Sequence, residues 1–322
     1  MVDSLSDALH PTADQSVLFV TQFHLFGAAT PTGEAFKVLA ARSATSSPVF
    51  SYSRTPQQGD SGFHEADLLK PAVFSPAGDP GQPSIWVSFA PIWLLAPFLE
   101  QIACERPEHL RGLRALIACS SSSARTKRYA ANEFDRDLAR NLHLAETQLL
   151  ATCRHHAVLC CILQPTLIYG RAGTFTDRNL SRLVALMRRL PLLPLPARTG
   201  LRQPIHASQL AAVSLALAHR PLTRNGSAIF PERLALGGDR ELTYRAMLQA
   251  LQQTLPEGDP ARRCRILAVP NRLLFFLSAP LLLRSPKAYE AVLRMGADLA
   301  GFTPSHKLLG GPAQAFPVLP LA

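Results

Sequence analysis

Short apolar runs that alternate with longer amphipathic segments are the feature that most restricts the fold of this chain. Five runs rich in β-branched or aromatic residues are expected strands: Val17–Phe26, Val49–Tyr52, Ile85–Phe89, Ala115–Cys119 and Val158–Leu163. Helical spacing occurs in segments such as Gly33–Ala41 and Leu138–His155. Because strands that alternate with helices build βαβ units, the pattern predicts an α/β fold with a Rossmann-like, doubly wound parallel sheet.

The character of the sequence changes near residue 191, where the expected elements become shorter. We expect a loose tail over residues 1–15, a dinucleotide-binding domain over 16–190, and a smaller substrate lobe over 191–322, with the chain free to cross between the two. Thr243–Leu255 and Lys287–Leu299 are expected helices of that lobe, and the proline-rich segments Pro71–Pro83 and Pro191–Pro196 are expected surface loops. A lobe placed over the carboxyl edge of a parallel sheet creates a crevice where ligands bind.

Composition narrows the class of partner. Apolar residues make up 47% and charged residues 17% of the chain, a balance typical of a packed globule. The net charge of +10 favours phosphorylated small molecules or anionic surfaces, but the basic residues are scattered and belong to no DNA-reading module, so we do not expect nucleic-acid binding. The six cysteines lack metal-site spacing and are expected to be buried thiols, and no signal peptide is visible; both indicate a cytoplasmic protein with no metal site.

The longest apolar stretch of the C-terminal part is LLFFLSAPLLL at residues 273–283, flanked by Arg272 and Arg284. It has about half of the roughly 20 residues that a membrane span needs, and Pro280 interrupts it. The stretch could lie on a membrane surface or form a helix packed on the core. We favour the packed helix, so peripheral membrane contact is an expectation of second rank.

A candidate dinucleotide turn follows the first expected strand. The segment FHLFGAATPTG at 23–33 leads from a strand into a helix, where backbone amides can hold a pyrophosphate. Gly27 allows the tight turn and Gly33 allows close packing of helix on strand, whereas Thr30 stands where a third glycine is expected. Arg54 lies at the end of the second strand, where a cation can pair with a 2′-phosphate. We therefore expect NADP in preference to NAD if a dinucleotide binds.

Taken together, residues 17–310 resemble the extended short-chain dehydrogenase/reductases, the superfamily of nucleotide-sugar epimerases, dehydratases and reductases. GAATPTG resembles the dinucleotide turn, HEADLLKP the end of the third strand, SFAP the end of the fourth, ACSSSSA the end of the fifth and LQPTLIYG the family's RPxxxYG segment, with Gln164 in place of arginine. RQPIHASQLA at 202–211 and LALGGDRELTYRAML at 234–248 resemble later segments, and RMGADL with LLG resembles members acting on sugar nucleotides or polyprenyl-linked sugars.

The resemblance implies roles for particular residues. The cofactor contacts that it implies are Gly27, Ala28, Thr30, Thr32, Gly33, Arg54, Asp67, Leu68, Ala90 and Pro165. Ser122 and Ser123 stand at the serine or threonine that bonds a substrate oxygen. Arg171, Arg178, Asn179 and Arg202 surround the expected substrate loop, where guanidinium groups suit a diphosphate; they could equally be surface residues.

The catalytic pair of that family is missing. In active members a tyrosine and a lysine four residues later exchange a proton with the substrate, and a glutamate follows the lysine by four. Glu146 occupies the glutamate position, so Leu138 and Leu142 stand at the tyrosine and lysine positions. Tyr129 could be a displaced acid or base, although a loop tyrosine is the simpler interpretation, and His143 is expected on the helix surface.

Three functions remain open. The chain could be an NAD(P)-dependent epimerase, dehydratase or reductase with an altered acid/base group, acting on a nucleotide-linked or polyprenyl-linked sugar. It could instead be a pseudoenzyme that keeps the ligand-shaped pocket and scaffolds or regulates a protein partner. An accessory protein at a membrane surface is the third. Loss of both catalytic groups favours the pseudoenzyme; a homodimer through the helix that carries Leu138 is implied by the resemblance alone.

Overall fold

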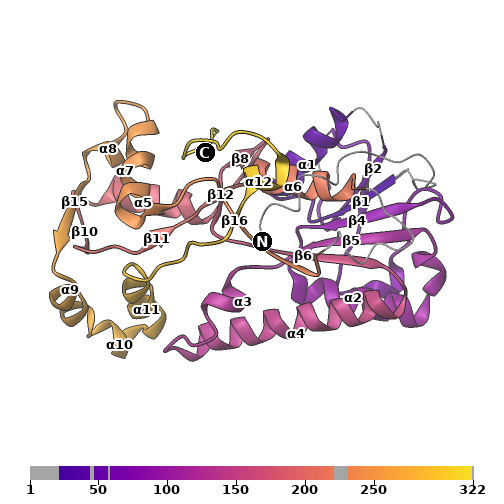
Figure 1. Cartoon of the computed structure of the whole chain (residues 1–322), viewed down its shortest axis with the longest axis horizontal. Coiled ribbons are helices and arrows are strands. Elements are labelled where there is room, and N and C mark those ends of the chain that lie inside the picture. Colours follow the sequence, from indigo (N-terminus) through magenta and orange to yellow (C-terminus); the bar gives the residue numbers. More distant parts are fainter. Residues whose placement is uncertain (1–21, 44–46, 57–58, 221–230, 321–322) are drawn as a thin grey trace, which may run out of the picture.

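The centre of the molecule is an eight-stranded sheet in which every neighbouring pair of strands is parallel (Figure 1). The computed structural model describes residues 22–43, 47–56, 59–220 and 231–320. The strand order is β16-β13-β6-β5-β4-β1-β2-β3. The strands are β1 (Gln22–Phe26), β2 (Val49–Ser53), β3 (Phe63–Glu65), β4 (Ser84–Ser88), β5 (Leu113–Cys119), β6 (Leu159–Pro165), β13 (Arg233–Gly237) and β16 (Thr303–Pro304). This confirms the predicted α/β class and its Rossmann-like, doubly wound sheet.

Helices cover both faces of this sheet. On one face α2 (Ile92–Glu105) packs beside α4 (Glu133–His155), and on the other α1 (Pro31–Ala41) packs beside α6 (Ala207–Ala218) and α12 (Ser305–Leu309) (Figure 1). Each face has its own hydrophobic core, one around Trp86 and Phe98 and one around Phe36 and Ile117. The central strands are therefore buried on both sides, as their continuous apolar runs require.

Helices α1 and α4 begin at side-chain caps. Thr30 caps α1 by accepting from the Gly33 amide at 3.0 Å, and Pro31 is its first residue. Asn132 caps α4 by accepting from the Asp135 amide at 2.9 Å. Because this cap lies upstream of the first apolar repeat, α4 is five residues longer at its start than the predicted Leu138–His155 helix.

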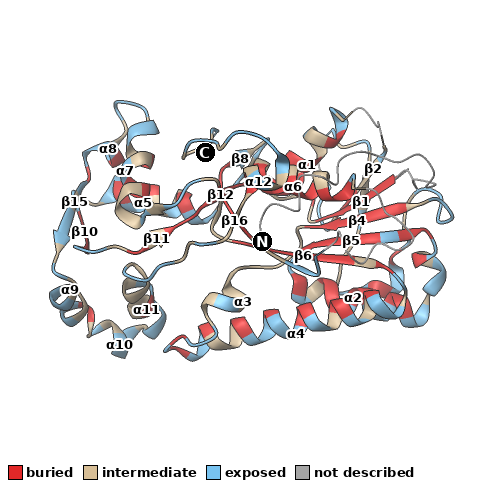
Figure 2. Cartoon of the chain, viewed as in Figure 1, coloured by how far each residue is buried: buried red, intermediate tan, exposed pale blue. Residues whose placement is uncertain are grey.

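A smaller lobe projects from the carboxyl side of the sheet (Figures 1 and 2). It holds α5 (Asn179–Arg189), β10 (Leu192–Pro196), α7 (Tyr244–Thr254), α8 (Pro260–Arg263) and β15 (Arg265–Val269) around a third core. The helices α9 (Asn271–Ser278), α10 (Leu281–Arg284) and α11 (Pro286–Arg294) also belong to the lobe but contribute no buried residue to that core. Short strands join it to the main sheet: β7 (Ile168–Tyr169), β8 (Arg171–Ala172), β9 (Phe175–Thr176), β11 (Leu201–Arg202), β12 (Ile205–His206) and β14 (Leu242–Thr243). The chain crosses to the lobe and back, because α6, β13, β16 and α12 belong to the main layers. The short α3 (Ser123–Thr126) precedes α4.

The segment Pro191–Pro196 is not the predicted surface loop. Residues Leu192–Pro196 form β10, which pairs in parallel with β15 in a two-stranded sheet. Leu193 and Leu195 point into the core of the lobe, whereas Leu192 and Pro194 are exposed. Prolines are tolerated here because β10 has a single strand neighbour, so a missing N–H can lie on the unpaired side. The alternation of leucine and proline was the signal for this edge strand.

The apolar stretch 273–283 does not form the predicted helix packed on a core. It is divided between α9 and α10, which Pro280 separates, and most of its large side chains face solvent. In the part of the chain that the structure describes, no helix has both the length and the apolar character to cross a bilayer. Residues 1–15 and the first part of the expected strand Val17–Phe26 lie outside the described residues.

Candidate functional site

The turn after β1 has the backbone geometry of a nucleotide-binding turn. Gly27 has a φ of +74°, and a Cβ added there would lie 2.6 Å from the backbone nitrogen of Ala90, at the end of β4. A Cβ added at Gly33 would lie 2.6 Å from the carbonyl oxygen of Gly27. Both glycines are therefore required for the close approach of β1, β4 and α1. Ala28 and Thr32 are buried between these elements.

The same turn offers few donors to a pyrophosphate. Pro31, the first residue of α1, has no N–H. The Gly33 amide donates to Thr30 Oγ1, and the Glu34 amide donates to the Thr30 carbonyl oxygen at 2.9 Å. Thr30 Oγ1 in turn donates to the Gly27 carbonyl oxygen at 2.8 Å. The turn thus has the close backbone approach that a dinucleotide needs. However, the Gly33 and Glu34 amides, which could bind its phosphates, already donate to Thr30.

The residues expected around an adenosine group lie at the carboxyl ends of neighbouring strands. Arg54 follows β2 directly and is exposed, and Asp67 and Leu68 follow β3 by two and three residues. The Asp67 carboxylate accepts from the Leu69 amide at 3.0 Å. Since β1, β2, β3 and β4 are parallel neighbours, these residues and Ala90 share one edge of the sheet. The structure thus brings together at one edge the residues that were predicted for the adenosine end of a dinucleotide.

The serine-rich segment after β5 lies against the end of β6. The Ser122 amide donates to the carbonyl oxygen of Pro165 at 2.9 Å, which brings a predicted catalytic residue to a predicted cofactor contact. Ser123 begins α3, and its amide donates to Ser121 Oγ at 3.1 Å. Burial raises the pKa of the Cys119 thiol at the end of β5 to about 12. That thiol is neutral at pH 7 and is not a nucleophile.

Apolar side chains occupy the helix positions where the family's tyrosine and lysine would stand. Leu142 is 2% exposed and belongs to the core between the sheet and α2, and Leu138 packs against that core. Ala145, Leu149 and Cys153 continue the same buried face, as the sequence spacing predicted. Hydrocarbon groups neither donate nor accept a proton, so α4 presents no acid or base at these two positions.

One turn further along α4, Glu146 is a buried carboxylate with several donors. Its side chain is 1% exposed. Ser120 Oγ donates to Oε1 at 2.6 Å, and Gln164 Nε2 lies 2.9 Å from both carboxylate oxygens. Arg233 Nε on β13 donates to Oε2 at 3.0 Å. The positive charge that the resemblance places at position 164 is thus supplied here by the neighbouring strand.

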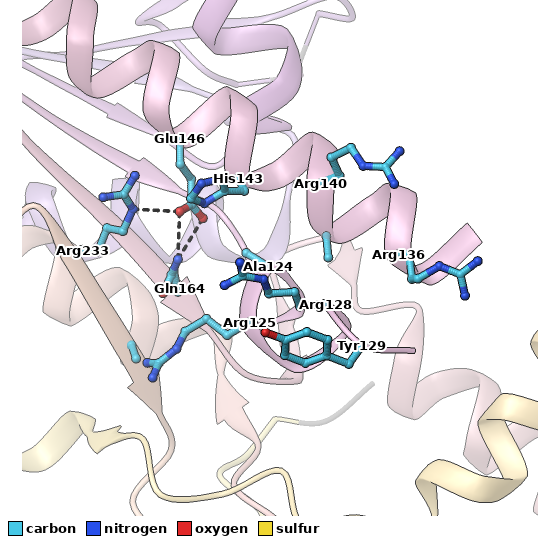
Figure 3. Close-up of a pocket in the computed structure, with 12 residues that line it drawn as sticks. Ala124, Arg125, Arg128, Tyr129, Arg136, Arg140, His143, Glu146, Gln164 and Arg233 are labelled. Carbon is cyan, nitrogen blue, oxygen red and sulfur yellow. Dashed lines mark hydrogen bonds and ion pairs between the residues drawn. The ribbon is translucent and has the colours of Figure 1, made fainter. Parts of the chain in front are cut away.

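Glu146 lies at the wall of a cavity of about 770 Å³ between α3, α4, β6 and β13 (Figure 3). The volume lies in the range of small-molecule sites. Five arginines share the lining, against the single carboxylate of Glu146: Arg125, Arg128, Arg136, Arg140 and Arg233. Within the described residues, no acidic partner is recorded for Arg125 or Arg128. The cavity therefore carries a net positive charge suited to an anionic ligand.

Tyr129 and His143 also line this cavity. The Tyr129 ring is 87% exposed, and the Arg128 guanidinium lies 5.6 Å from its centroid. Lys127, which precedes this pair, is held by Asp135 at 2.6 Å. Burial acts to raise the pKa of Asp135, but hydrogen bonds from Lys127 and Asn132 outweigh burial and lower that pKa. His143 is exposed on α4, as predicted.

The predicted substrate-loop residues lie in two places. Arg171, Arg178 and Asn179 are exposed around β8 and the start of α5, and Arg171 Nε donates to the Gly173 carbonyl oxygen at 3.0 Å. Arg202 is 7% exposed on β11. Its guanidinium donates to the carbonyl oxygens of Leu201, Ala297 and Arg294 and lies over the Tyr244 ring at 5.0 Å. The Arg202 guanidinium thus holds the end of α11 in place. The N–H groups that it uses for this are those that would otherwise bind an anion.

Over the described ranges, no group of three histidine, cysteine, aspartate or glutamate residues is arranged to hold a metal ion. Four of the six cysteines are buried, whereas Cys104 is exposed and Cys119 is intermediate, so the prediction of buried thiols is wrong for Cys104. No disulfide joins them.

The fold and the sheet edge place this chain among proteins with the Rossmann-like architecture of nucleotide-sugar epimerases and reductases. No family profile matches the sequence, and neither does any curated protein. Similar solved structures include UDP-glucuronic acid 4-epimerase from Bacillus cereus with NAD, at 13% identity over 91% of this chain and 94% of that one, with a TM-score of 0.57.

Two other similar structures carry NADP(H) or NADPH. Triphenylmethane reductase from Citrobacter with NADP(H) is 12% identical over 92% of this chain and 97% of that one, with a TM-score of 0.57. The human epimerase family protein SDR39U1 with NADPH is 13% identical over 92% and 96%, with a TM-score of 0.56. At these identities the likeness establishes the shared fold.

Sequence reasoning missed two features of the site. Pro31 stands inside the quoted turn GAATPTG, and a proline at the first helical position was a readable sign that one phosphate-binding amide is absent. Arg233 precedes the quoted segment at 234–248, and only the parallel pairing of β13 with β6 brings it to Glu146. No local pattern could have identified that second contact.

Proposed function

We propose that this chain is a nucleotide-binding pseudoenzyme of the short-chain dehydrogenase/reductase type. It binds a dinucleotide weakly at the carboxyl edge of its sheet, with NADP preferred to NAD, and it does not carry out the tyrosine/lysine-dependent reaction. The observation that carries the proposal is the packing of Leu142 and Leu138 in the core beneath α4. A pocket that holds a ligand without a proton carrier suits a scaffold or regulator of a partner protein.

The sheet edge supports a dinucleotide in shape and at its adenosine end. Gly27 and Gly33 keep the turn close to the sheet, and exposed Arg54 supplies a cation for a 2′-phosphate. Solved structures with this fold carry NAD, NADP(H) or NADPH. The Thr30 cap and Pro31 argue for weak affinity, because each removes a donor that the phosphates would use.

The arginine-lined cavity supports a second, phosphate-bearing ligand. Arg125 and Arg128 can bind phosphate oxygens bidentately, and the Tyr129 ring beside Arg128 offers a flat surface at the rim. A nucleotide-linked or polyprenyl-linked sugar has both a diphosphate and the necessary size. Glu146 is already bonded by Ser120, Gln164 and Arg233, so it does not oppose such a ligand as a bare charge would.

Titration of the purified chain with NADPH and NADH, followed by calorimetry, tests the cofactor assignment. We expect NADPH to bind more tightly than NADH, and Arg54→Ala to weaken NADPH more than NADH. The double variant Thr30→Gly with Pro31→Ala returns one amide and frees another, and should raise NADPH affinity roughly tenfold. Thr243→Gly is the matched control, since Thr243 caps α7 in the lobe by accepting from the Ala246 amide at 3.1 Å.

Absence of binding by both the natural chain and the Thr30/Pro31 variant at millimolar concentration would remove the dinucleotide. Equal effects of Arg54→Ala on the two cofactors would refute the preference for NADP. Turnover of any nucleotide-sugar with NADPH would contradict the pseudoenzyme assignment. Loss of that turnover in Tyr129→Phe would identify Tyr129 as a displaced acid or base, the alternative that its place in the cavity favours.

A further inference from the structure

The end of the smaller lobe carries a group of large apolar side chains that face solvent. We call it the α9–α10 patch; it consists of Leu273, Phe276 and Leu277 on α9 and Leu282 and Leu283 on α10. Their exposed fractions are 48%, 76%, 64%, 47% and 95% respectively. Figures 1 and 2 show α9 and α10 at the tip of the lobe, far from the main sheet. Grouped apolar exposure of this kind indicates an interaction surface.

The arrangement of α9 explains why the apolar side chains of the patch are not buried within the fold. Leu273, Phe276 and Leu277 follow the spacing i, i+3, i+4, so they form one stripe on the outer side of the helix. The opposite side of α9 already contacts the lobe through β10 and α11. A helix that is apolar on both sides and packed on only one keeps the other side available for a partner.

The charges around the patch indicate which partner fits. Between Asp259 and Glu290 the sequence has six basic residues and no acidic residue: Arg262, Arg263, Arg265, Arg272, Arg284 and Lys287. Arg272 on α9, Arg284 at the end of α10 and Lys287 at the start of α11 are exposed. Glu290, the first carboxylate after the patch, is 8% exposed. The surface thus combines an apolar centre with an uncompensated basic border.

We propose that the α9–α10 patch docks the protein on an anionic lipid surface. The apolar stripe would enter the boundary between headgroups and acyl chains, while the basic side chains contact lipid phosphates. α9 has eight residues and α10 has four, so the segment lies in the interface and does not span the bilayer. This proposal is independent of both proposed ligand sites, because none of the patch residues belongs to the turn after β1 or lines the arginine-lined cavity.

A second copy of the chain fits this surface less well than lipid does. A twofold interface places the same patch against itself, so Arg272, Arg284 and Lys287 of each copy would meet like charges. Lipid headgroups carry the opposite charge. The same argument requires that docking depend on anionic lipid and weaken with salt, since the Debye length shortens as ionic strength rises.

Vesicle sedimentation of the full chain tests the proposal. Vesicles of phosphatidylcholine with about 30% phosphatidylglycerol should bind the protein, and pure phosphatidylcholine should bind it at least roughly tenfold less. Phe276→Ser with Leu283→Ser should weaken binding roughly tenfold, because two anchoring side chains are lost. Arg272→Gln with Arg284→Gln and Lys287→Gln should remove the dependence on phosphatidylglycerol and on salt.

Val73→Ser with Phe134→Ser is the matched control. These side chains are 78% and 74% exposed but lie on the main domain, so this variant should bind vesicles like the natural chain. Equal loss in the control, binding that ignores lipid charge and salt, or no binding to anionic vesicles would each overturn the proposal. A concentration-dependent dimer that Phe276→Ser with Leu283→Ser converts to monomer, with no vesicle binding, would assign the patch to a second copy instead.

Discussion

Replacing Arg233 with glutamine breaks its ion pair with buried Glu146. This should destabilise the protein more than breaking the shorter but exposed ion pair between Arg154 and Glu232. Among the residues that the structure describes, Arg233 is the only cation that donates a hydrogen bond to Glu146, whose side chain is 1% exposed. Breaking a buried pair costs about 3–5 kcal/mol, and a hydrogen bond to a charged group contributes about 1.5–3 kcal/mol. Arg233 is 34% exposed, and Ser120 and Gln164 still donate, so we expect a loss of about 2 kcal/mol.

Urea unfolding followed by circular dichroism measures this change in the free energy of unfolding. The control is Arg154→Gln, which breaks the pair of Arg154 with Glu232 at 2.6 Å, where the side chains are 69% and 54% exposed. That shorter pair should contribute less than about 0.5 kcal/mol, because solvent screens it. The double variant Gln164→Arg with Arg233→Gln returns the cation from β6 and should recover about 1 kcal/mol. Equal losses for the two single variants, with no recovery in the double variant, would refute the account of Glu146.

Two further predictions concern β1 and its turn. Burial, and to a smaller extent repulsion from His64, lower the pKa of His24 from 6.5 to about 4. Between these two pH values the unfolded chain takes up a proton that the folded chain lacks, so the free energy of unfolding should fall by about 3 kcal/mol as the pH drops from about 6.5 to 4. His24→Leu should flatten this dependence, measured by urea titrations at several pH values. Gly27→Ala should lower the free energy of unfolding by about 3 kcal/mol, because φ is +74° and the new Cβ would meet Ala90. Gly310→Ala, with a φ of +68° and open space around it, should cost only about 1 kcal/mol, and similar losses at both glycines would show that the contact with Ala90 is unimportant.

The main sheet could be predicted because each of its central strands is a continuous apolar run in the sequence. The expected strand Ile85–Phe89 differs from β4 by one residue at each end, and the expected strand Ala115–Cys119 lies within β5. Such strands are buried on both faces, so the whole run is apolar. β3 and β16 have three and two residues, and no apolar run of that length stands out from its surroundings.

The placement of the apolar stretch 273–283 was predicted wrongly. Its apolar character favoured a helix packed on the core, but most of its large side chains face solvent. Hydropathy shows that a segment prefers to leave water, but it does not show whether the protein or another surface receives it. Pro280 divides the segment, and only one side of α9 contacts the lobe. The sequence alone therefore identified the segment and its charged flanks but placed it wrongly.

The site was predictable where it depends on order along the chain and not where it depends on pairing across the sheet. Leu138, Leu142 and Glu146 share one helix, so their spacing could be read directly. The partners of Glu146 come from the loop after β5, from β6 and from β13, and the arginine-lined cavity joins α3 and α4 to β13. These contacts are set by strand order, which a local pattern does not encode.

The lengths of the outermost strands bear on self-association. A long, flat sheet border exposes unpaired backbone N–H and C=O groups that can recruit strands from other molecules. Here the two borders are β3, with three residues, and β16, with two, the second of them Pro304. So short a border is a poor template for amyloid-like growth. At high concentration, clustering of this protein should therefore not extend the main sheet from one molecule to the next.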